Sequence, residues 1–240
     1  MFFDAPVLER GEVSKTRLKQ FDLELLQPEE GYRFSVDSLL LAEFVRLKKG
    51  ARQVVELGGG CGVVSLILAR RYPGASFQIL EIQSELFELC RRNVALNRLS
   101  DRAECVQGDI GQVRSIWPAA AFHHVVTNPP FRRPETGRLC LYSQEALARH
   151  EILVNLEQVL DAASYLLGSG GRFTIIFPAE RCAELIHSMS SFRLEPKRIR
   201  MVHPRIDRQA RMVMVEAVKD GGSQVRIEPP LFINREDGAA

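Results

Sequence analysis

One stretch of the sequence, VVELGGGCG at residues 54–62, decides the fold. Its first half has the apolar character and the length of a buried strand, which we expect over Gln53–Leu57. Glycines follow at once, and after them a helical pattern covers Val63–Tyr72. Glycines in a strand-to-helix turn let the backbone adopt positive φ angles and approach a ligand closely. Such a turn is typical of a doubly wound α/β sheet, in which ligands bind beyond the carboxyl ends of the strands.

Strand and helix patterns alternate along the chain from this stretch onward. Further helices are expected over Ser84–Asn97, Glu145–Leu167 and Pro178–Ser190. The expected strands are Gln53–Leu57, Ser76–Glu81, Ala103–Gln107, Val125–Asn128, Arg172–Phe177, Lys197–Val202 and Arg211–Ala217. This alternation predicts a parallel sheet with helices on both faces.

The last two strands have no obvious helix between them, so we expect them to pair antiparallel at the edge of the sheet. The predicted fold class is therefore α/β: a Rossmann-like, doubly wound, seven-stranded and mostly parallel sheet with an antiparallel edge strand. Residues 1–50 are expected to form an N-terminal extension that packs on a main domain, residues 51–235. The extension would contain a short hairpin around Leu18–Leu26 and a helix over Asp37–Leu47, with Ser35 as its N-cap.

The composition excludes several classes of protein. A net charge of only +2 gives no global signal for a polyanion. The cysteines at 61, 90, 105, 140 and 182 form no C-x-x-C pair, which argues against a disulfide framework and a cysteine-rich zinc site. The histidines show no metal-ligand spacing, so no metal is expected. No signal peptide and no run of eighteen apolar residues is evident, so we expect a cytoplasmic protein without a membrane span.

The glycine stretch carries an acidic-x-G-x-G-x-G spacing, formed by Glu56, Gly58, Gly60 and Gly62. A dinucleotide site would need a third glycine where Val63 stands, which disfavours a nicotinamide oxidoreductase. The spacing resembles the first motif of class I methyltransferases that use S-adenosylmethionine (SAM). SAM carries an ammonium group, near which an acidic side chain such as Glu56 makes electrostatic sense. The alternative is a plain glycine-rich turn.

Two more acidic residues follow expected strands, and both join the candidate cofactor site. Glu81 closes the second strand, where a carboxylate can accept both hydroxyls of a ribose, and Ile82 beside it can pack on adenine. After the third strand comes Asp109 with Ile110. In the methyltransferases that the glycine motif resembles, an Asp here accepts a hydrogen bond from the adenine amino group. A charged strand end and an Asp-containing turn or N-cap are the structural alternatives.

The segment Asn128-Pro129-Pro130-Phe131 follows the fourth strand and carries the candidate catalytic residues. The two prolines fix φ and make the loop rigid. The Asn128 side-chain oxygen and the Pro129 carbonyl can then accept from the two hydrogens of one amino group, while Phe131 stacks on the flat ring that bears it. Such acceptors favour a more tetrahedral nitrogen whose lone pair faces the methyl donor. The alternative is a proline-rich turn with an asparagine cap.

This segment resembles the Asp/Asn-Pro-Pro-Tyr/Phe motif of SAM-dependent methyltransferases that act on planar nitrogens. Over about residues 20–232 the chain is similar to the bacterial tRNA(Val) adenine-N6 methyltransferase family. The matching features are residues 31–37 and 39–42, Arg92-Asn93-Val94 with Asn97, residues 148–151, and Pro229-Pro230-Leu231. The resemblance implies that residues 51–235 form a SAM-dependent methyltransferase domain, with Asn128 also bordering the cofactor and residues 32–37 near its methionine end. It further implies methylation of adenine N6 in RNA, at a tRNA adenine near the anticodon.

The substrate is expected to contact Phe131, the loop residues Arg132 and Arg133, and His150. A histidine at such a place more often has a purely structural role, which is the alternative for His150. Other acceptors stay open at this point, namely guanine N2 of rRNA, adenine N6 of DNA and glutamine of a protein. A non-catalytic RNA-binding protein with a SAM fold is a further alternative, which the intact motifs disfavour. The sequence carries no pattern that assigns an oligomeric state.

Overall fold

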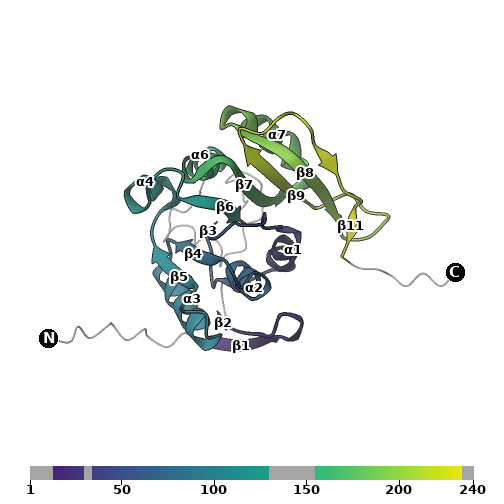
Figure 1. The fold of residues 1–240 in the computed structure, drawn as a ribbon. Coiled ribbons are helices and arrows are strands. Elements are labelled where there is room, and N and C mark those ends of the chain that lie inside the picture. Colours follow the sequence, from purple (N-terminus) through teal and green to yellow (C-terminus); the bar gives the residue numbers. More distant parts are fainter. Residues whose placement is uncertain (1–12, 30–33, 130–154, 234–240) are drawn as a thin grey trace.

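The computed structural model describes residues 13–29, 34–129 and 155–233. Within these residues the centre is a nine-stranded sheet in the order β10-β8-β9-β7-β6-β3-β4-β5, with β11 also paired to β8 (Figure 1). The strands are β3 (Gln53–Leu57), β4 (Ser76–Glu81), β5 (Ala103–Gln107), β6 (Phe122–Thr127), β7 (Leu167–Pro178), β8 (Leu194–His203), β9 (Met212–Lys219), β10 (Arg226–Ile227) and β11 (Leu231–Phe232).

The predicted fold class is confirmed. Strands β3 to β7 pair in parallel, and β9 runs antiparallel to both β7 and β8. The last two expected strands, β8 and β9, pair antiparallel as predicted. However, β9 lies between β7 and β8 rather than outside them. The edge strands β10 and β11 add to the expected seven, and two residues each are too few to give a periodic sequence signal.

Helices cover both faces of the sheet (Figure 1). Adjacent residues of β3 show why, since Val54 packs into one buried cluster and Val55 into another on the opposite face. The first cluster includes residues of α1 (Val36–Phe44), α2 (Val63–Arg71) and α3 (Ser84–Leu96). The second includes residues of α4 (Val113–Ile116), α6 (Leu156–Leu166) and α7 (Cys182–Ser191). The start of the expected helix Glu145–Leu167 lies outside the described residues, and its described part is α6.

The helix expected over Asp37–Leu47 is shorter in the structure, where α1 ends at Phe44 because Val45 leaves the helical conformation with ψ 130°. Before it lies the expected hairpin, β1 (Val13–Leu18) and β2 (Leu23–Pro28). The buried side chains of β2 join the same core cluster as α1 and α2. A domain boundary at residue 50 stays a prediction.

Two asparagines, Asn93 in α3 and Asn97 at its C-cap, bind the hairpin as a neighbouring strand would. Asn97 accepts from the backbone N–H of Glu24 at 2.9 Å and donates to its carbonyl at 2.7 Å. Asn93 does the same for Leu26, at 2.7 and 2.9 Å, and also donates to the carbonyl of Cys61 at 2.9 Å. Buried backbone groups of β2 are thereby satisfied. The same bonds connect the hairpin to the glycine-rich turn.

Candidate functional site

The glycine-rich turn after β3 fits tightly against β4. Gly58, Gly60 and Gly62 all have positive φ angles, of 70°, 57° and 85°. Gly59 has no room for a side chain, because a Cβ atom there would lie 2.2 Å from a methyl carbon of Ile79. The turn is therefore closed against the sheet at Gly59, whereas a Cβ atom at Gly58 would meet nothing within 4 Å. It forms a cradle in which a ligand can approach the main chain closely.

Glu81, at the end of β4, binds the backbone of this cradle through its carboxylate. Its Oε2 accepts from the N–H of Gly60 at 2.8 Å, and its Oε1 accepts from the N–H of Gln83 at 2.9 Å. The carboxylate is 5% exposed. Because an ionised carboxylate has about four acceptor positions, both oxygens can still accept from a ligand. The next residue, Ile82, is 38% exposed, so an apolar surface lies beside the carboxylate.

Glu56 is buried and turned toward helix α2. It accepts from both the backbone N–H and the hydroxyl of Ser65, in the first turn of α2. Burial raises the pKa of the Glu56 carboxyl group to about 7, and the nearby charge of Glu81 adds to that rise. The sequence interpretation placed Glu56 near a bound cation but missed Ser65, whose signal was a hydroxyl residue in the first helical turn. Whether Glu56 also serves a ligand stays a prediction.

This raised pKa predicts a pH-dependent stability. Between about pH 4.5 and pH 7 the folded chain holds a proton on Glu56 that the unfolded chain releases. Stability therefore falls as the pH rises through this window, by at most about 1.4 kcal/mol per pH unit from this group. In Glu56→Gln this contribution is absent. Urea denaturation from pH 5 to pH 7.5 should show the wild-type chain losing stability relative to the variant.

Glu104 on β5 provides the control, because its side chain is exposed and bonds only to Gln78 among the described residues, at 2.9 Å. Glu104→Gln should follow the wild-type pH profile. Identical pH profiles for Glu56→Gln and the wild-type chain would show that Glu56 does not titrate in this window.

Asp109 and Ile110 lie in the turn after β5. Asp109 accepts from the N–H of Gly111 at 2.7 Å and caps a short 3-10 turn, as the structural alternative predicted. The side chain of Ile110 is 7% exposed and packs in the core, so the backbone of Ile110 is the part nearer to a ligand. The turn is joined to β4 by a hydrogen bond from the N–H of Gly108 to the carbonyl of Glu81, 3.0 Å long.

Asn128 stands directly after β6, beside the glycine-rich turn. The preceding Thr127 donates from its hydroxyl to the carbonyl of Leu57 at 2.8 Å, which joins the ends of β6 and β3. The Asn128 Nδ2 group donates to the hydroxyl oxygen of Ser38 on α1 at 3.1 Å. Among the described residues, none donates a hydrogen bond to the Asn128 Oδ1 atom.

The four turns after β3, β4, β5 and β6 meet at one edge of the sheet. Hydrogen bonds between adjacent strand ends hold them together. The structure brings most of the expected site residues together at this edge. They are Glu56, Gly58, Gly60, Gly62, Glu81, Ile82, Asp109, Ile110, Asn128 and the buried Pro129. Pro130, Phe131, Arg132, Arg133 and His150 lie outside the described residues. In the described ranges, no group of three or more His, Cys, Asp or Glu side chains is arranged to hold a metal ion.

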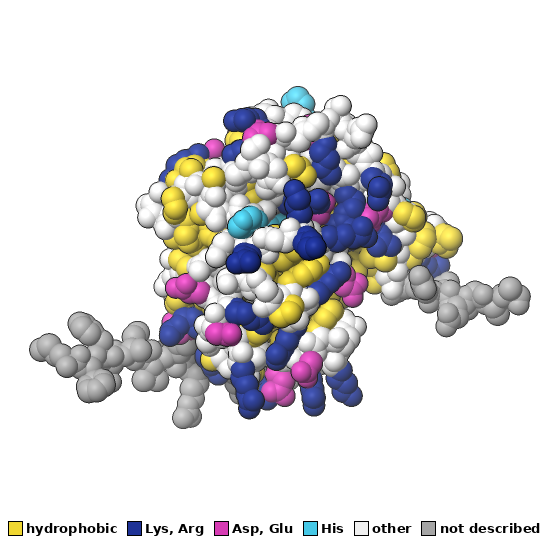
Figure 2. Space-filling model, viewed as in Figure 1, with side chains coloured by type: hydrophobic (Ala, Val, Ile, Leu, Met, Phe, Trp, Pro, Cys, Tyr) yellow, Lys and Arg dark blue, Asp and Glu magenta, His cyan; other side chains and the backbone are white. Residues whose placement is uncertain are grey.

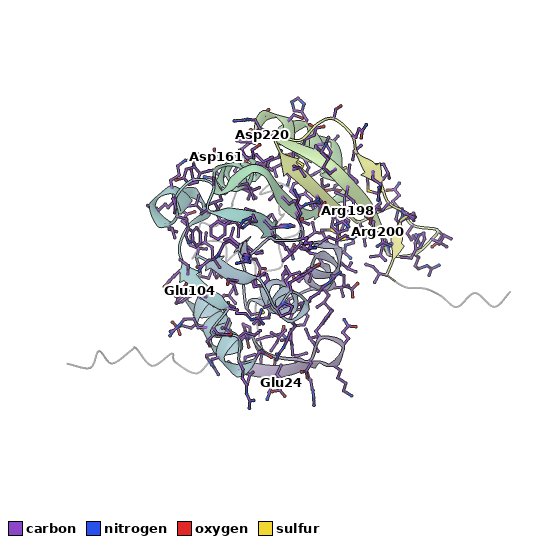
Figure 3. All side chains as sticks on the ribbon, viewed as in Figure 1. Glu24, Glu104, Asp161, Arg198, Arg200 and Asp220 are labelled. Atoms are coloured by element: carbon purple, nitrogen blue, oxygen red, sulfur yellow. The ribbon has the colours of Figure 1, made fainter. Side chains whose placement is uncertain are left out.

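A basic cavity of about 510 Å³ lies toward the amino ends of the strands, at the opposite edge. Figure 2 shows Lys and Arg side chains gathered on this face, and Figure 3 labels Arg198 there, on β8. Arg198 is 5% exposed and lies 3.3 Å from Glu216, which also pairs with Arg172. The other basic residues that line the cavity are Arg46, Lys48, Lys197 and Arg226. The buried pairs stabilise the sheet rather than belong to the candidate site.

The family model of the methyltransferase small domain matches residues 33–184, which include all four turns. The chain belongs to this family. It is also 31% identical, over 75% of its length and 71% of the relative, to a tRNA1(Val) (adenine(37)-N6)-methyltransferase of Porphyromonas gingivalis. An enzyme of the same name from Shewanella putrefaciens is 29% identical over 74% of this chain and 72% of its own.

A solved structure from Agrobacterium tumefaciens, described as a predicted O-methyltransferase, gives a TM-score of 0.67 at 26% identity. It covers 85% of this chain and 90% of its own. The family confirms the activity class expected from the sequence, which is SAM-dependent methyl transfer. The residues at the carboxyl edge fit SAM, because the glycine cradle admits a ligand to the main chain and the Glu81 carboxylate adjoins the exposed side chain of Ile82.

Proposed function

We propose that this chain transfers the methyl group of SAM to the exocyclic N6 nitrogen of an adenine in tRNA, next to the anticodon. One observation carries the proposal: the Asn128 amide lies at the end of β6, beside the glycine cradle, and its oxygen accepts from none of the described residues. The names of the relatives support the same acceptor, since they specify adenine 37 of tRNA1(Val).

The glycine cradle and the turns beside it hold the cofactor in this proposal. Gly58, Gly60 and Gly62 let the ligand lie against the backbone, and Glu81 accepts from the ribose hydroxyls with the acceptor positions that Gly60 and Gln83 leave open. The exposed Ile82 side chain packs on the adenine ring of the cofactor. The Asp109 carboxylate and the Ile110 backbone lie at its amino group, and Glu56 lies near its ammonium group, whose positive charge would favour the ionised form of the Glu56 carboxyl group.

Asn128 and Pro129 orient the acceptor nitrogen. When bound, SAM supplies an electrophilic methyl group on a sulfonium. An aromatic amine is a weak nucleophile because its lone pair is delocalised into the ring. The Asn128 oxygen and the Pro129 carbonyl accept from its two hydrogens and direct the lone pair toward the methyl donor, with Pro130 keeping the loop rigid. Phe131 stacks on the adenine. Because the nitrogen attacks with its lone pair, no strong base is needed before attack, and the methylated nitrogen afterwards loses one of its N–H protons to solvent.

The tRNA partner accounts for the basic residues after this loop. Arg132 and Arg133 contact phosphates near the target base, and His150 contributes to substrate binding. No helix in the described ranges has the length and apolarity that crossing a membrane requires. We infer that the chain acts in the cytoplasm, where tRNA is modified.

A panel of acceptors tests this function. Purified chain is incubated with methyl-labelled SAM and, separately, with tRNA, rRNA, duplex DNA and a release-factor protein. Labelled products are digested and separated by chromatography. The proposal predicts label in N6-methyladenosine from tRNA. Label in 2-methylguanosine, in DNA, in glutamine or on an oxygen atom would assign another acceptor and contradict the proposal.

A further inference from the structure

A buried serine of α1 holds the side chain of Asn128. The 3.1 Å bond from Asn128 Nδ2 to Ser38 Oγ joins residues ninety positions apart, and Ser38 is 2% exposed. We propose that Ser38 is a positioning residue that orients the Asn128 amide so that its oxygen, and not its nitrogen, faces the acceptor amine. This inference rests on the proposed function, because it assigns Asn128 Oδ1 as the acceptor of the substrate's N–H group.

Ser38 is in a fixed position. Its backbone N–H donates to the carbonyl of Ser35 at 3.1 Å, which closes the first turn of α1. One turn later, Leu41 and Ala42 are fully buried in the core that α1 shares with α2. The hydroxyl therefore presents itself to Asn128 from a rigid element rather than from a loop.

An asparagine needs such a partner because its two ends have nearly the same shape. Rotation of the terminal amide by 180° exchanges an acceptor oxygen for a donor NH2 group. With the nitrogen turned toward the substrate, two donors would face each other, and the substrate amine would lose an acceptor. A carboxylate at position 128 would not have this problem, since both of its ends are acceptors.

The bond to Ser38 holds the amide in one of its two orientations. A hydroxyl can donate as well as accept, and in the structure Ser38 Oγ accepts from Asn128 Nδ2 and donates to no carbonyl of the described residues. With Nδ2 engaged by Ser38, Oδ1 is the end of the amide left for the acceptor amine. Threonine at this position has the same capacity.

A double-mutant cycle tests the role. Because one net hydrogen bond corresponds to a population factor of about 2 to 12, Ser38→Ala should lower kcat about 3- to 10-fold and leave the KM for SAM within about twofold. Ser38→Thr should restore most of kcat. In the Asn128→Asp background, which offers two acceptor oxygens, Ser38→Ala should change kcat less than about twofold. Ser115→Ala, an exposed serine of α4 whose hydroxyl donates to the carbonyl of Gln112, is the control and should leave kcat unchanged.

A second measurement does not depend on the acceptor. Nuclear magnetic resonance of the chain without substrate should show the Asn128 NH2 protons protected from exchange with water, since one of them bonds to buried Ser38. Protection should be lost in Ser38→Ala and kept in Ser38→Thr. If the wild-type chain failed to methylate tRNA, the proposed function would fail, and this result would still decide whether Ser38 orients the amide.

Two outcomes overturn the proposal. If Ser38→Ala lowered kcat equally in the wild-type chain and in the Asn128→Asp background, Ser38 would serve only the packing of α1. Unchanged protection of the Asn128 NH2 protons in Ser38→Ala would mean that the hydroxyl does not fix their direction.

Discussion

Asn128→Ala is expected to lower kcat by about 100- to 1000-fold, the effect of removing one preorganised polar group at a reacting centre. The affinity for SAM should change less than about threefold, because no other described residue depends on this side chain except Ser38, through one hydrogen bond. In the proposed function the amide oxygen acts on the acceptor nitrogen, whereas the glycine cradle and Glu81 would hold the cofactor. Methyl transfer to tRNA gives kcat, and isothermal titration gives the SAM affinity.

Asn155→Ala is the matched control for this variant. Asn155 caps α6 by accepting from the N–H of Glu157 at 3.1 Å, so its loss should cost about 1 kcal/mol of stability and no activity. A fully active Asn128→Ala chain would refute the assigned role. A parallel loss of SAM binding and turnover would instead make Asn128 part of the cofactor site alone.

Glu216→Gln is expected to lower the free energy of unfolding by about 3–5 kcal/mol. Glu216 is 3% exposed in β9 and lies between Arg172 and Arg198. Without its charge, the buried Arg198 and the partly exposed Arg172 lose their shared counter-ion, and among the described carboxylates only Glu228, 3.4 Å from Arg198, remains beside that guanidinium group. Because domains of this kind are stable by only about 5–15 kcal/mol, the loss should be evident as a large drop in the urea midpoint.

Asp161→Asn is the control for charge alone. Asp161, labelled in Figure 3, makes a two-bond pair with Arg114, at 2.6 and 3.0 Å. Both side chains are about half exposed. Solvent screens such a pair, so its loss should cost less than about 1 kcal/mol. If both variants lost the same free energy of unfolding, burial would not explain the contribution of the Glu216 ion pairs to stability.

The sequence was sufficient to predict the features that are set by residues close together in the chain. The strand Gln53–Leu57, the glycine cradle and the helix after it follow from an apolar run, a cluster of glycines and a helical pattern in direct succession. The carboxyl-edge position of Glu81, Asp109 and Asn128 follows from parallel pairing, because the ends of parallel strands meet at one edge.

The features missed by the sequence interpretation depend on contacts between distant residues. Nothing local to Ser38 indicates that it bonds to Asn128, and nothing local to Glu81 indicates that it accepts from Gly60. Asn93 was noticed only as part of a resemblance, although it satisfies both the backbone of β2 and the carbonyl of Cys61. The insertion of β9 between β7 and β8 is likewise a matter of packing order, which strand patterns do not encode. The site roles of Phe131, Arg132, Arg133 and His150 stay predictions, since these residues lie outside the described ranges.

The most direct measurement is mass spectrometry of nucleosides from purified tRNA. Three strains are compared, one with the gene, one without it, and one carrying only Asn128→Ala. The proposed function predicts N6-methyladenosine in the first strain, at the adenine next to the anticodon of one valine tRNA, and its absence from that position in the other two. Equal N6-methyladenosine at that position in all three strains would contradict it.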